Sequence, residues 1–496
     1  MIIAITIIIV YTIALLIIFF YAISQINLLF NYIKHKKTIK LQTKPDLSVF
    51  KELPIVTIQL PVYNEMYVMH RLLANIAQID YPKEKLEIQV LDDSTDETVF
   101  DTKKQIIALQ KTGLDIKHIT RTERSNFKAG ALKEGLKVAK GEFIAIFDAD
   151  FLPEKDWLNL TLPYFIDEQI GVVQTRWGHI NKDYSLLTKI QAFALDLHFT
   201  LEQVGRNSQN HFINFNGTAG IWRKSCIIDA GNWQGDTLTE DLDLSYRAQL
   251  KNWKFHYVED IVTPAELPVV ISAARSQQFR WNKGGAENFQ KMIKKIISSK
   301  NIPSKTKWHA AFHLLNSSMF FIIFIVAILS VPILYIKANF PEFKFMFYLM
   351  AFFLSSTIMF FFCYWIAFSQ IYGGGIKKLF IFIPKFFIFF SIAMGFSWHN
   401  TIAILEGHFG KKSEFIRTPK FNVNSIADKW KNNKYIVKSL PFSLIIEGVL
   451  MLYFGFGLYS AFLVKQDGFD FGMFPFHLML FTGFTYVFCN SIFSRS

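Results

Sequence analysis

Cysteine and charge are both scarce in this sequence of 496 residues. It has only three cysteines, Cys226, Cys363 and Cys489, which excludes a disulfide framework of the kind that holds small secreted domains together. Charged residues make up 19% of the chain, against about 25% in an average soluble protein, while 51% are hydrophobic and 53 residues are phenylalanine. A disordered chain is rich in charge and poor in aromatics, so disorder is excluded. A single soluble globule is also disfavoured, because so many phenylalanines would be hard to bury.

Several motifs that mark common enzyme classes are absent as well. The sequence has neither G-x-G-x-x-G nor G-x-x-x-x-G-K-[ST], so it lacks both of the glycine-rich loops that bind phosphate groups. It has no H-E-x-x-H and no paired C-x-x-C, which would indicate a zinc site. It also lacks G-x-S-x-G, the nucleophile motif of α/β-hydrolases.

Positive charge is in excess, because 53 Lys and Arg stand against 40 Asp and Glu, which gives a net charge of +13. Such a balance can indicate nucleic-acid binding. The basic residues, however, cluster beside long apolar runs, and no groove-reading motif is evident. We therefore predict no nucleic-acid partner and interpret the excess as the cytoplasmic positive charge of a membrane protein.

The first residues predict a membrane anchor. Residues 2–30 carry no charge, and Lys34, Lys36 and Lys37 follow them. The positive-inside rule then places the N-terminus outside and the following domain, residues 31–305, in the cytoplasm. We therefore expect an N-terminal anchor over residues 1–30 in an integral protein of the inner (plasma) membrane.

The C-terminal part of the chain predicts further spans. Two apolar runs lie in residues 306–370 and two more in 439–496, each about 20 residues or longer: 310–336, 345–370, 439–464 and 473–493. Glu447 lies inside one of them, where an acid is either functional or close to the end of the span.

Residues 376–397 are apolar too, but Pro384 and Lys385 interrupt them. The segment that follows, 398–438, has eight Lys or Arg against three acids. A crossing at 376–397 would place this basic segment outside, against the positive-inside rule. For residues 371–438 we therefore favour an interfacial or re-entrant helix and a cytoplasmic loop, with five crossings in total instead of six and a cytoplasmic C-terminus.

The domain between the anchor and the later spans predicts an α/β fold. Three short apolar runs each end in polar residues: 55–60 before PVYNE, 86–91 before DDSTD, and 142–147 before DAD. Such runs suit strands buried on both faces, and helical patterns over 98–110 and 128–141 separate them. Alternating strands and helices indicate a mostly parallel sheet covered on both faces. Ligands bind beyond the carboxyl ends of such strands, which is where Asp92, Asp93, Asp148 and Asp150 fall.

Three groups of residues are candidates for metal binding, catalysis or substrate binding. Asp148 and Asp150 form a D-x-D pair that suits Mg²⁺ shared with substrate phosphates, although loop acids can also be simply solvated. The pattern Thr237-x-x-Glu240 predicts a helix cap, so Asp241 would lie in the first turn, either complementing the helix dipole or acting as a general base. Gln277, Arg280 and Trp281 would share one helix face, which can grip a diphosphate and stack on a sugar, or lie on the membrane surface.

Six motifs occur in an order and at a spacing that resemble the processive family-2 glycosyltransferases. They are PVYNE (61–65), DDSTD (92–96), KAG (128–130), FDAD (147–150), TED (239–241) and QQFRW (277–281). The likeness is closest to the plant cellulose-synthase-like synthases of mannan and glucan backbones, which FNGTAGIWR (215–223) and AELP (265–268) also resemble. FIRTPK (415–420) is similar to the gating-loop motif of cellulose synthases, with departures at Arg417 and Pro419.

This resemblance implies a GT-A fold, a Rossmann-like mixed sheet embedded in a bundle of transmembrane helices, and an inverting reaction. Residues that would bind the nucleotide-diphosphate sugar are Tyr63 and Glu65 at the base, Asp93 at the nucleoside, Lys128 near the donor, Asp148 and Asp150 at the diphosphate through Mg²⁺ or Mn²⁺, and Gln277 and Arg280 closing over it.

On the acceptor side, the resemblance implies that Asp241 takes the proton from the acceptor hydroxyl. Trp281 would stack on the acceptor sugar, and Gly217 and Glu240 would shape the acceptor cleft. Phe415, Thr418 and Lys420 would belong to a gating loop.

Three functions are compatible with these observations. The first is a processive synthase that polymerises a β-1,4-linked glycan from GDP-mannose or UDP-glucose and translocates it. The second is the transfer of a single sugar to a lipid acceptor, either a polyprenyl phosphate or a sphingolipid. The third is a membrane scaffold without activity, which the intact acids and QQFRW disfavour. The sequence predicts a nucleotide-sugar donor, a growing glycan or lipid acceptor, and contact with membrane lipids, and it is silent on accessory subunits.

Overall fold

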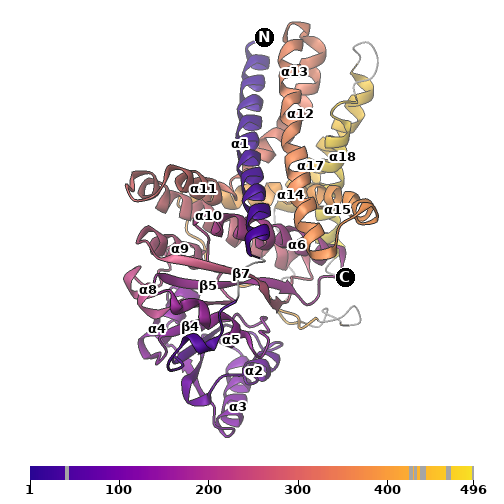
Figure 1. Cartoon of the computed structure of the whole chain (residues 1–496). Helices are drawn as coiled ribbons and strands as arrows, with labels where there is room; N and C mark the ends of the chain where they lie inside the picture. The colour runs from indigo at the N-terminus through magenta and orange to yellow at the C-terminus, as the bar shows by residue number, and fades with distance from the viewer. Residues whose placement is uncertain (40–43, 424–427, 429–432, 436–442, 465–470, 494–496) are drawn as a thin grey trace.

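A seven-stranded mixed sheet forms the centre of residues 54–265, which we call the sheet domain. The computed structural model of the chain describes residues 1–39, 44–423, 428, 433–435, 443–464 and 471–493 (Figure 1). The strands are β1 (Val56–Val62), β2 (Leu86–Asp92), β3 (Asp115–Thr120), β4 (Phe143–Ile146), β5 (Ile170–His179), β6 (Gly220–Arg223) and β7 (Lys254–Ala265). Their order is β3-β2-β1-β4-β6-β5-β7. β6 is antiparallel to both of its neighbours and every other pair is parallel, so the predicted mixed α/β sheet is confirmed.

The three predicted strands are β1, β2 and β4, which lie side by side in the middle of the sheet. Nearly all of their residues are buried, because helices cover both faces, and this burial explains why they read as continuous apolar runs. β1 pairs with β2 in a register that sets Val62 level with Asp92, so the residues after both strands meet at one edge. β3 is an edge strand with only one buried residue, and its sequence therefore gave no such signal.

The helices surround the sheet and continue beyond it. In chain order they are α1 (Ile2–Ile39), α2 (Met69–Ile76), α3 (Thr98–Gln110), α4 (Phe127–Val138), α5 (Trp157–Thr161), α6 (Leu186–Leu197), α7 (Gln203–Asn207), α8 (Lys224–Asp229), α9 (Glu240–Leu250), α10 (Ile271–Ser298), α11 (Ser304–Leu315), α12 (Met319–Asn339), α13 (Lys344–Ala351), α14 (Ser355–Tyr372), α15 (Ile376–Gly395), α16 (Ser397–His408), α17 (Ser443–Leu463) and α18 (Phe474–Phe493).

Long apolar helices form a bundle on one side of the sheet domain. Six helices in the described residues are long and apolar enough to cross a membrane: Ile2–Thr38, Met319–Asn339, Pro341–Tyr372, Ile376–Gly395, Ser443–Leu463 and Phe474–Phe493. The run predicted from residue 310 is divided in the structure, because α11 ends at Leu315 and the apolar helix begins at Met319. In Figure 1 the N-terminus lies at the end of the bundle farthest from the sheet domain, and α10 and α11 lie between the two.

The sequence favours an interfacial or re-entrant helix at 376–397 over a membrane crossing. The helix there, α15, lies at the base of the bundle near α6 (Figure 1). It packs against α18, α14 and α6, and the last of these belongs to the sheet domain. The Lys385 ammonium lies 5.5 and 5.7 Å from the ring centres of Phe368 and Tyr372, near the end of α14. Whether α15 lies at the interface or crosses the membrane, and with it the number of crossings, five or six, stays a prediction.

One apolar core runs from the sheet domain into the bundle. Leu28 and Tyr32 of α1, Ile144 of β4, Tyr364 of α14 and Phe382 of α15 belong to the same cluster of buried residues. Side chains that bury one another in this way hold their elements at fixed positions. The sheet domain is therefore packed against the apolar helices and is not merely tethered to them.

Glycines allow α15 and α18 to approach closely. A Cβ atom on Gly483 would overlap the Ser391 carbonyl oxygen, and one on Gly395 would overlap the Gly483 carbonyl oxygen. Small residues let apolar helices pack backbone to backbone in this way.

We therefore expect Gly483→Ala to force the two helices apart and to destabilise the protein by about 1–3 kcal/mol. Thermal unfolding of the purified protein in detergent measures this effect. Gly374→Ala is the matched control, because a Cβ there would meet only Ser369, at 3.9 Å. Equal unfolding midpoints for the two variants would contradict the prediction.

Candidate active site

The residues that follow β1, β2 and β4 meet at the carboxyl edge of the sheet. These strands are adjacent and parallel, so their ends lie together. Every residue predicted for the site lines a single cavity at this edge: Tyr63, Glu65, Asp93, Lys128, Asp148, Asp150, Gly217, Glu240, Asp241, Gln277, Arg280, Trp281, Phe415, Thr418 and Lys420. The fold thus brings together segments that are up to 357 residues apart in sequence, although the role of each residue stays a prediction.

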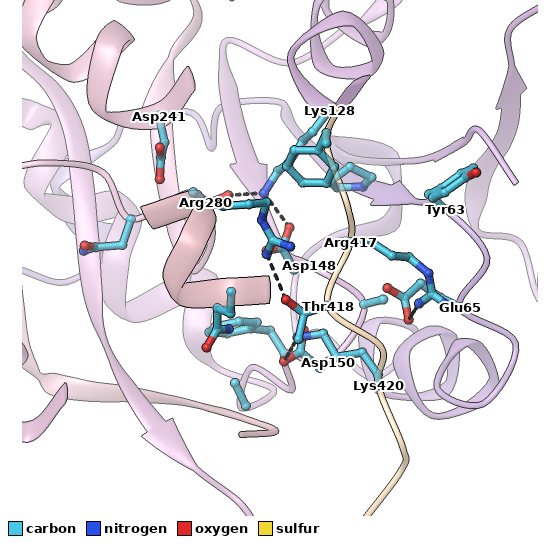
Figure 2. A pocket seen from close by; sticks show the side chains of 18 of the residues that line it. Tyr63, Glu65, Lys128, Asp148, Asp150, Asp241, Arg280, Arg417, Thr418 and Lys420 are labelled. Carbon is cyan, nitrogen blue, oxygen red and sulfur yellow. Dashed lines mark hydrogen bonds and ion pairs between the residues drawn. The ribbon is translucent and has the colours of Figure 1, made fainter. Parts of the chain in front are cut away.

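Lys128 lies at the centre of this cavity. Its Nζ donates to Asp148 Oδ1 at 2.5 Å and to the Gly217 carbonyl oxygen at 2.8 Å (Figure 2). Burial by itself would lower the pKa of Lys128, but the carboxylates of Asp148, Glu240 and Asp241 together raise this pKa above its usual range, so the ammonium stays charged. Gly217 has a φ of +80°, and a Cβ atom there would lie 2.9 Å from Asp241 Oδ2. The glycine therefore allows the backbone to pass close to Asp241.

Asp241 lies in the first turn of α9, as predicted. The predicted cap by Thr237 is wrong, because the helix begins at Glu240 with Thr239 at the N-cap, and the Thr237 hydroxyl donates to the Thr239 carbonyl at 3.3 Å. Asn288 of α10 explains the difference. Its side chain donates to the Thr239 hydroxyl at 2.9 Å and to the Thr239 carbonyl at 3.2 Å, so a tertiary contact fixes the start of this helix.

Burial gives Asp241 an unusual acidity. Burial raises the pKa of Asp241 above the ordinary aspartate range, the neighbouring Glu240 carboxylate raises it further, and Lys128 opposes both. Burial likewise raises the pKa of Glu240. Figure 2 shows Asp241 on one side of Lys128 and Asp148, with Tyr63 and Glu65 on the other. A carboxylate whose pKa is raised in this way is suited to accept a proton from a hydroxyl group.

Asp148 and Asp150 can hold a divalent cation if a substrate completes its coordination. Within the described residues, no group of three or more His, Cys, Asp or Glu is placed to bind a metal. Asp150 Oδ2 accepts from Lys420 Nζ at 2.7 Å, whereas its buried Oδ1 has no partner among the described residues. Mg²⁺ needs only one or two carboxylates where phosphates supply further ligands. The two aspartates therefore fit the predicted Mg²⁺ or Mn²⁺.

The segment 415–420 lies in the cavity beside Arg280 (Figure 2). The Arg280 guanidinium donates to the Ile416 carbonyl and, at 2.9 Å, to the Thr418 hydroxyl, and it lies 4.8 Å from the Phe415 ring centre. Burial lowers the pKa of Arg280 to about 10, so the group remains protonated at neutral pH. The residues predicted for a gating loop thus contact the helix that carries QQFRW.

Arg417, which departs from the gating-loop motif, reaches the opposite end of the cavity. Its NH1 lies 3.0 Å from Glu65 Oε2, and its guanidinium lies 4.0 Å from the Tyr435 ring centre. Burial raises the pKa of Glu65, and Arg417 and Lys420 oppose this shift. The departure from the motif therefore supplies the ion-pair partner of the Glu65 carboxylate.

Two arginines near the predicted nucleoside pocket were not predicted from the sequence. The Arg124 guanidinium lies 3.3 Å from the Tyr63 ring centre, and Arg121 Nε donates to Asp93 Oδ1 at 2.8 Å. Both residues follow β3, the edge strand that was not predicted. If β3 had been predicted as a strand, both arginines could have been placed at the site, because the carboxyl end of β3 lies at the same edge of the sheet as those of β1 and β2.

Glu266, which belongs to the AELP motif, holds the segment that leaves the cavity. Its carboxylate accepts from the Phe421 backbone N–H at 2.8 Å and pairs with Arg71 at 3.1 Å. Trp177 and His179, at the end of β5, also line the cavity.

The helix predicted around QQFRW is confirmed as α10. Gln277, Arg280 and Trp281 face the cavity together, as their spacing indicates. Trp281 remains 37% exposed, so part of its side chain is accessible to a ligand.

Comparison with known proteins identifies relatives of this chain. The family described as glycosyltransferase like family 2 matches residues 54–284. A glucomannan 4-beta-mannosyltransferase 9 of Arabidopsis thaliana is 35% identical over 442 residues, which are 86% of this chain and 78% of that protein. A probable glucomannan 4-beta-mannosyltransferase 11 of Oryza sativa subsp. japonica is 44% identical over 261 residues, but the match spans only 52% of this chain and 46% of the rice protein.

A solved structure supports the fold. It is the mannosyltransferase PcManGT from Pyrobaculum calidifontis in complex with GDP-Man and Mn²⁺, which superposes with a TM-score of 0.56 at 20% identity. The match covers 81% of this chain and all of that one. At this identity the likeness concerns the GT-A fold alone. The family match and the long match to the Arabidopsis relative show that the chain belongs to the family-2 glycosyltransferases and stands close to the cellulose-synthase-like mannan synthases.

Proposed function

We propose that this chain is a membrane-bound inverting glycosyltransferase that extends a β-1,4-linked glycan from a nucleotide-diphosphate sugar, with GDP-mannose as its donor. The observation that carries the proposal is the composition of the cavity at the carboxyl edge of the sheet. A half-buried acid, Asp241, lies on one side of it, while cations that suit a diphosphate and carboxylates that can bind a metal lie beside it. The relatives named as glucomannan mannosyltransferases support the choice of mannose over glucose.

The donor would lie along the strand ends. Tyr63, with Arg124 stacked on one face of its ring, offers a flat surface to the base, and Asp93 and Glu65 offer acceptors to the nucleoside. Lys128, Arg280 and Gln277 would contact the diphosphate, because charge-assisted hydrogen bonds from Arg and Lys are the strongest available to phosphate oxygens. A divalent cation held by Asp148 and Asp150 would supply further positive charge to the departing diphosphate.

The acceptor would enter past Trp281, where an exposed indole face can stack on a sugar ring. Asp241 takes the proton from the acceptor hydroxyl as its oxygen bonds to the anomeric carbon of the donor. The bond between that carbon and the diphosphate breaks, and the electron pair leaves with the nucleoside diphosphate. Attack on the face opposite the leaving group converts an α-linked donor into a β-linked product.

The apolar helices support export of the product. The sheet domain shares a core with α1, α14 and α15, so the cavity is fixed against the bundle. A polymer formed there would pass from the cavity directly into the membrane part of the protein, without first being released into the cytoplasm. In this proposal the sheet domain faces the cytoplasm of a multi-pass protein in the inner (plasma) membrane, as the distribution of Lys and Arg predicts.

A product assay tests the proposal. Membranes containing the protein are incubated with Mn²⁺ or Mg²⁺ and, separately, with labelled GDP-mannose, GDP-glucose or UDP-glucose. We expect label from GDP-mannose in ethanol-insoluble polymer that an endo-β-1,4-mannanase degrades. Label only in the solvent-soluble lipid fraction would instead establish transfer of a single sugar to a lipid, and the proposal of export would then fail.

The general base can be tested by Asp241→Asn. The amide cannot accept the proton, so transfer should fall by about 10²–10⁴-fold. Donor binding should change little, because the base is needed only when the hydroxyl is deprotonated. Turnover and donor binding, measured separately on purified protein, check this prediction.

Asp236→Asn is the matched control, because this acid lies in the same segment, is largely exposed and does not line the cavity. The wild-type rate should also rise with pH through the raised pKa of Asp241, since only the ionised carboxylate accepts a proton. Equal loss of binding and turnover in Asp241→Asn would show that the residue binds donor or caps the helix instead.

Asp150→Asn tests the metal site. Removal of one carboxylate should weaken donor binding in the presence of Mn²⁺ and leave binding in EDTA unchanged, because one ligand of the cation is lost. Titration of a fluorescent nucleoside diphosphate with and without the metal measures both. Binding that depends on the metal as in the wild type would remove Asp150 from the site.

A further inference from the structure

A fully buried ion pair joins the active-site helix to an apolar helix of the bundle. Arg275, in the second turn of α10, donates through NH2 to Glu447 Oε2 of α17. The Arg275 side chain is 7% exposed and the Glu447 side chain is completely buried. The pair accounts for the intramembrane acid that the sequence singled out, and it gives Glu447 a partner within the protein.

This pair lies on the side of α10 that faces away from the cavity. Gln277, Arg280 and Trp281 line the cavity, whereas Arg275 does not. The neighbouring contacts of this outer side are with α16: the His399 ring lies 3.1 Å from the Arg275 carbonyl oxygen, and Asn400 Nδ2 donates to Gln278 Oε1 at 2.9 Å. The face that would bind substrate and the face that carries the ion pair thus belong to one rigid helix.

A second ion pair, between Lys283 and Glu406, holds the other half of α10. Lys283, whose side chain has no exposed surface, donates to Glu406 Oε2 of α16 at 3.1 Å and to the Ser413 hydroxyl at 2.5 Å. Ser413 lies two residues before Phe415, where the segment in the cavity begins. α10 is therefore bound to the start of this segment through Lys283 and to the bundle through Arg275.

Stability alone gives little reason for a buried pair at Arg275 and Glu447. Apolar side chains of similar volume commonly serve as well or better in a protein interior. Here the pair also leaves Arg275 Nε and Glu447 Oε1 without hydrogen-bond partners among the described residues. What an ion pair provides, and apolar packing does not, is a directed contact that fixes one helix along the axis of another.

We infer that Glu447 is a positioning residue, which through Arg275 fixes α10 so that Arg280 reaches the donor diphosphate and Trp281 reaches the acceptor. This inference rests on the proposed function for the roles of Arg280 and Trp281. Glu447 contacts no substrate in this arrangement. Its effect on the reaction passes through the axial and rotational position of α10, where a displacement of about 1 Å can cost 10²-fold in rate.

The test compares four variants of the full-length protein in membranes and in detergent: Glu447→Asp, Glu447→Gln, Arg275→Gln and the double variant R275Q/E447Q. Glu447→Asp keeps the charge but withdraws the carboxylate by one methylene group. We expect it to remain folded, to raise the KM for the donor and to lower kcat/KM about 10-fold or more. A KM change is informative because loss of folded protein lowers the rate without changing KM. Glu342→Asp, an exposed acid near the start of α13, is the control.

The double variant separates positioning from stability. Each single neutralisation leaves an unpaired buried charge or polar group and should lower the unfolding temperature, whereas the double variant should recover it. We expect the double variant to recover stability without recovering KM or kcat. Wild-type kinetics in the double variant, or in Glu447→Asp, would show that the pair only satisfies buried charge and would overturn the inference.

Hydrogen–deuterium exchange provides a readout that does not depend on the donor or product. Glu447→Gln should increase exchange in peptides that cover residues 275–283 relative to those in β1 and β2. Unchanged exchange there would overturn the inference even in an active enzyme. A wild-type protein that makes no product from any tested sugar nucleotide would refute the proposed function, while exchange would still decide whether Glu447 fixes α10.

Discussion

Burial of many charged groups in one cavity is the constraint on which the rest of this structure depends. Carboxylates at the ends of neighbouring strands repel one another and lose hydration when they are buried, so each needs a cation nearby. Asp148 is paired with Lys128 of α4, and Asp150 is paired with Lys420 from the segment after α16. The acids come from the sheet, and their partners come from helices and segments that must fold onto it. The site therefore exists only when the whole chain is assembled.

Charged residues where the sheet domain meets the helical bundle also need partners of opposite charge. α10 carries three residues toward the cavity, and on its other side it places Arg275 against Glu447 and Lys283 against Glu406. A shared apolar core joins the sheet to the bundle elsewhere. Charge and apolar packing thus act together at this junction. Apolar contacts hold the sheet domain and the bundle against each other. The ion pairs favour one relative position among those that apolar packing alone would allow.

Segment 415–420 illustrates how a departure from a family motif can be accommodated. Phe415, Thr418 and Lys420 match the motif, and all three line the cavity. Arg417 does not match it, yet it pairs with Glu65 and lies against Tyr435. An arginine at this position introduces a charge that needs a partner, and the carboxylate of PVYNE provides one. The segment is therefore held in the cavity by contacts at both of its ends.

The sequence alone determined the elements whose residues are buried on all sides or carry chemistry in a fixed spacing. β1, β2 and β4 read as apolar runs because helices cover both of their faces, and the acids after them could be placed at one edge by the geometry of parallel strands. The partly exposed β3, and with it Arg121 and Arg124, lacked that signal. Tertiary structure alone decided the start of α9, which Asn288 fixes in place of Thr237, and the partners of Asp150, Glu65 and Glu447. These contacts join residues far apart in the chain, and no local pattern encodes them because their energy comes from burial that only the complete fold creates.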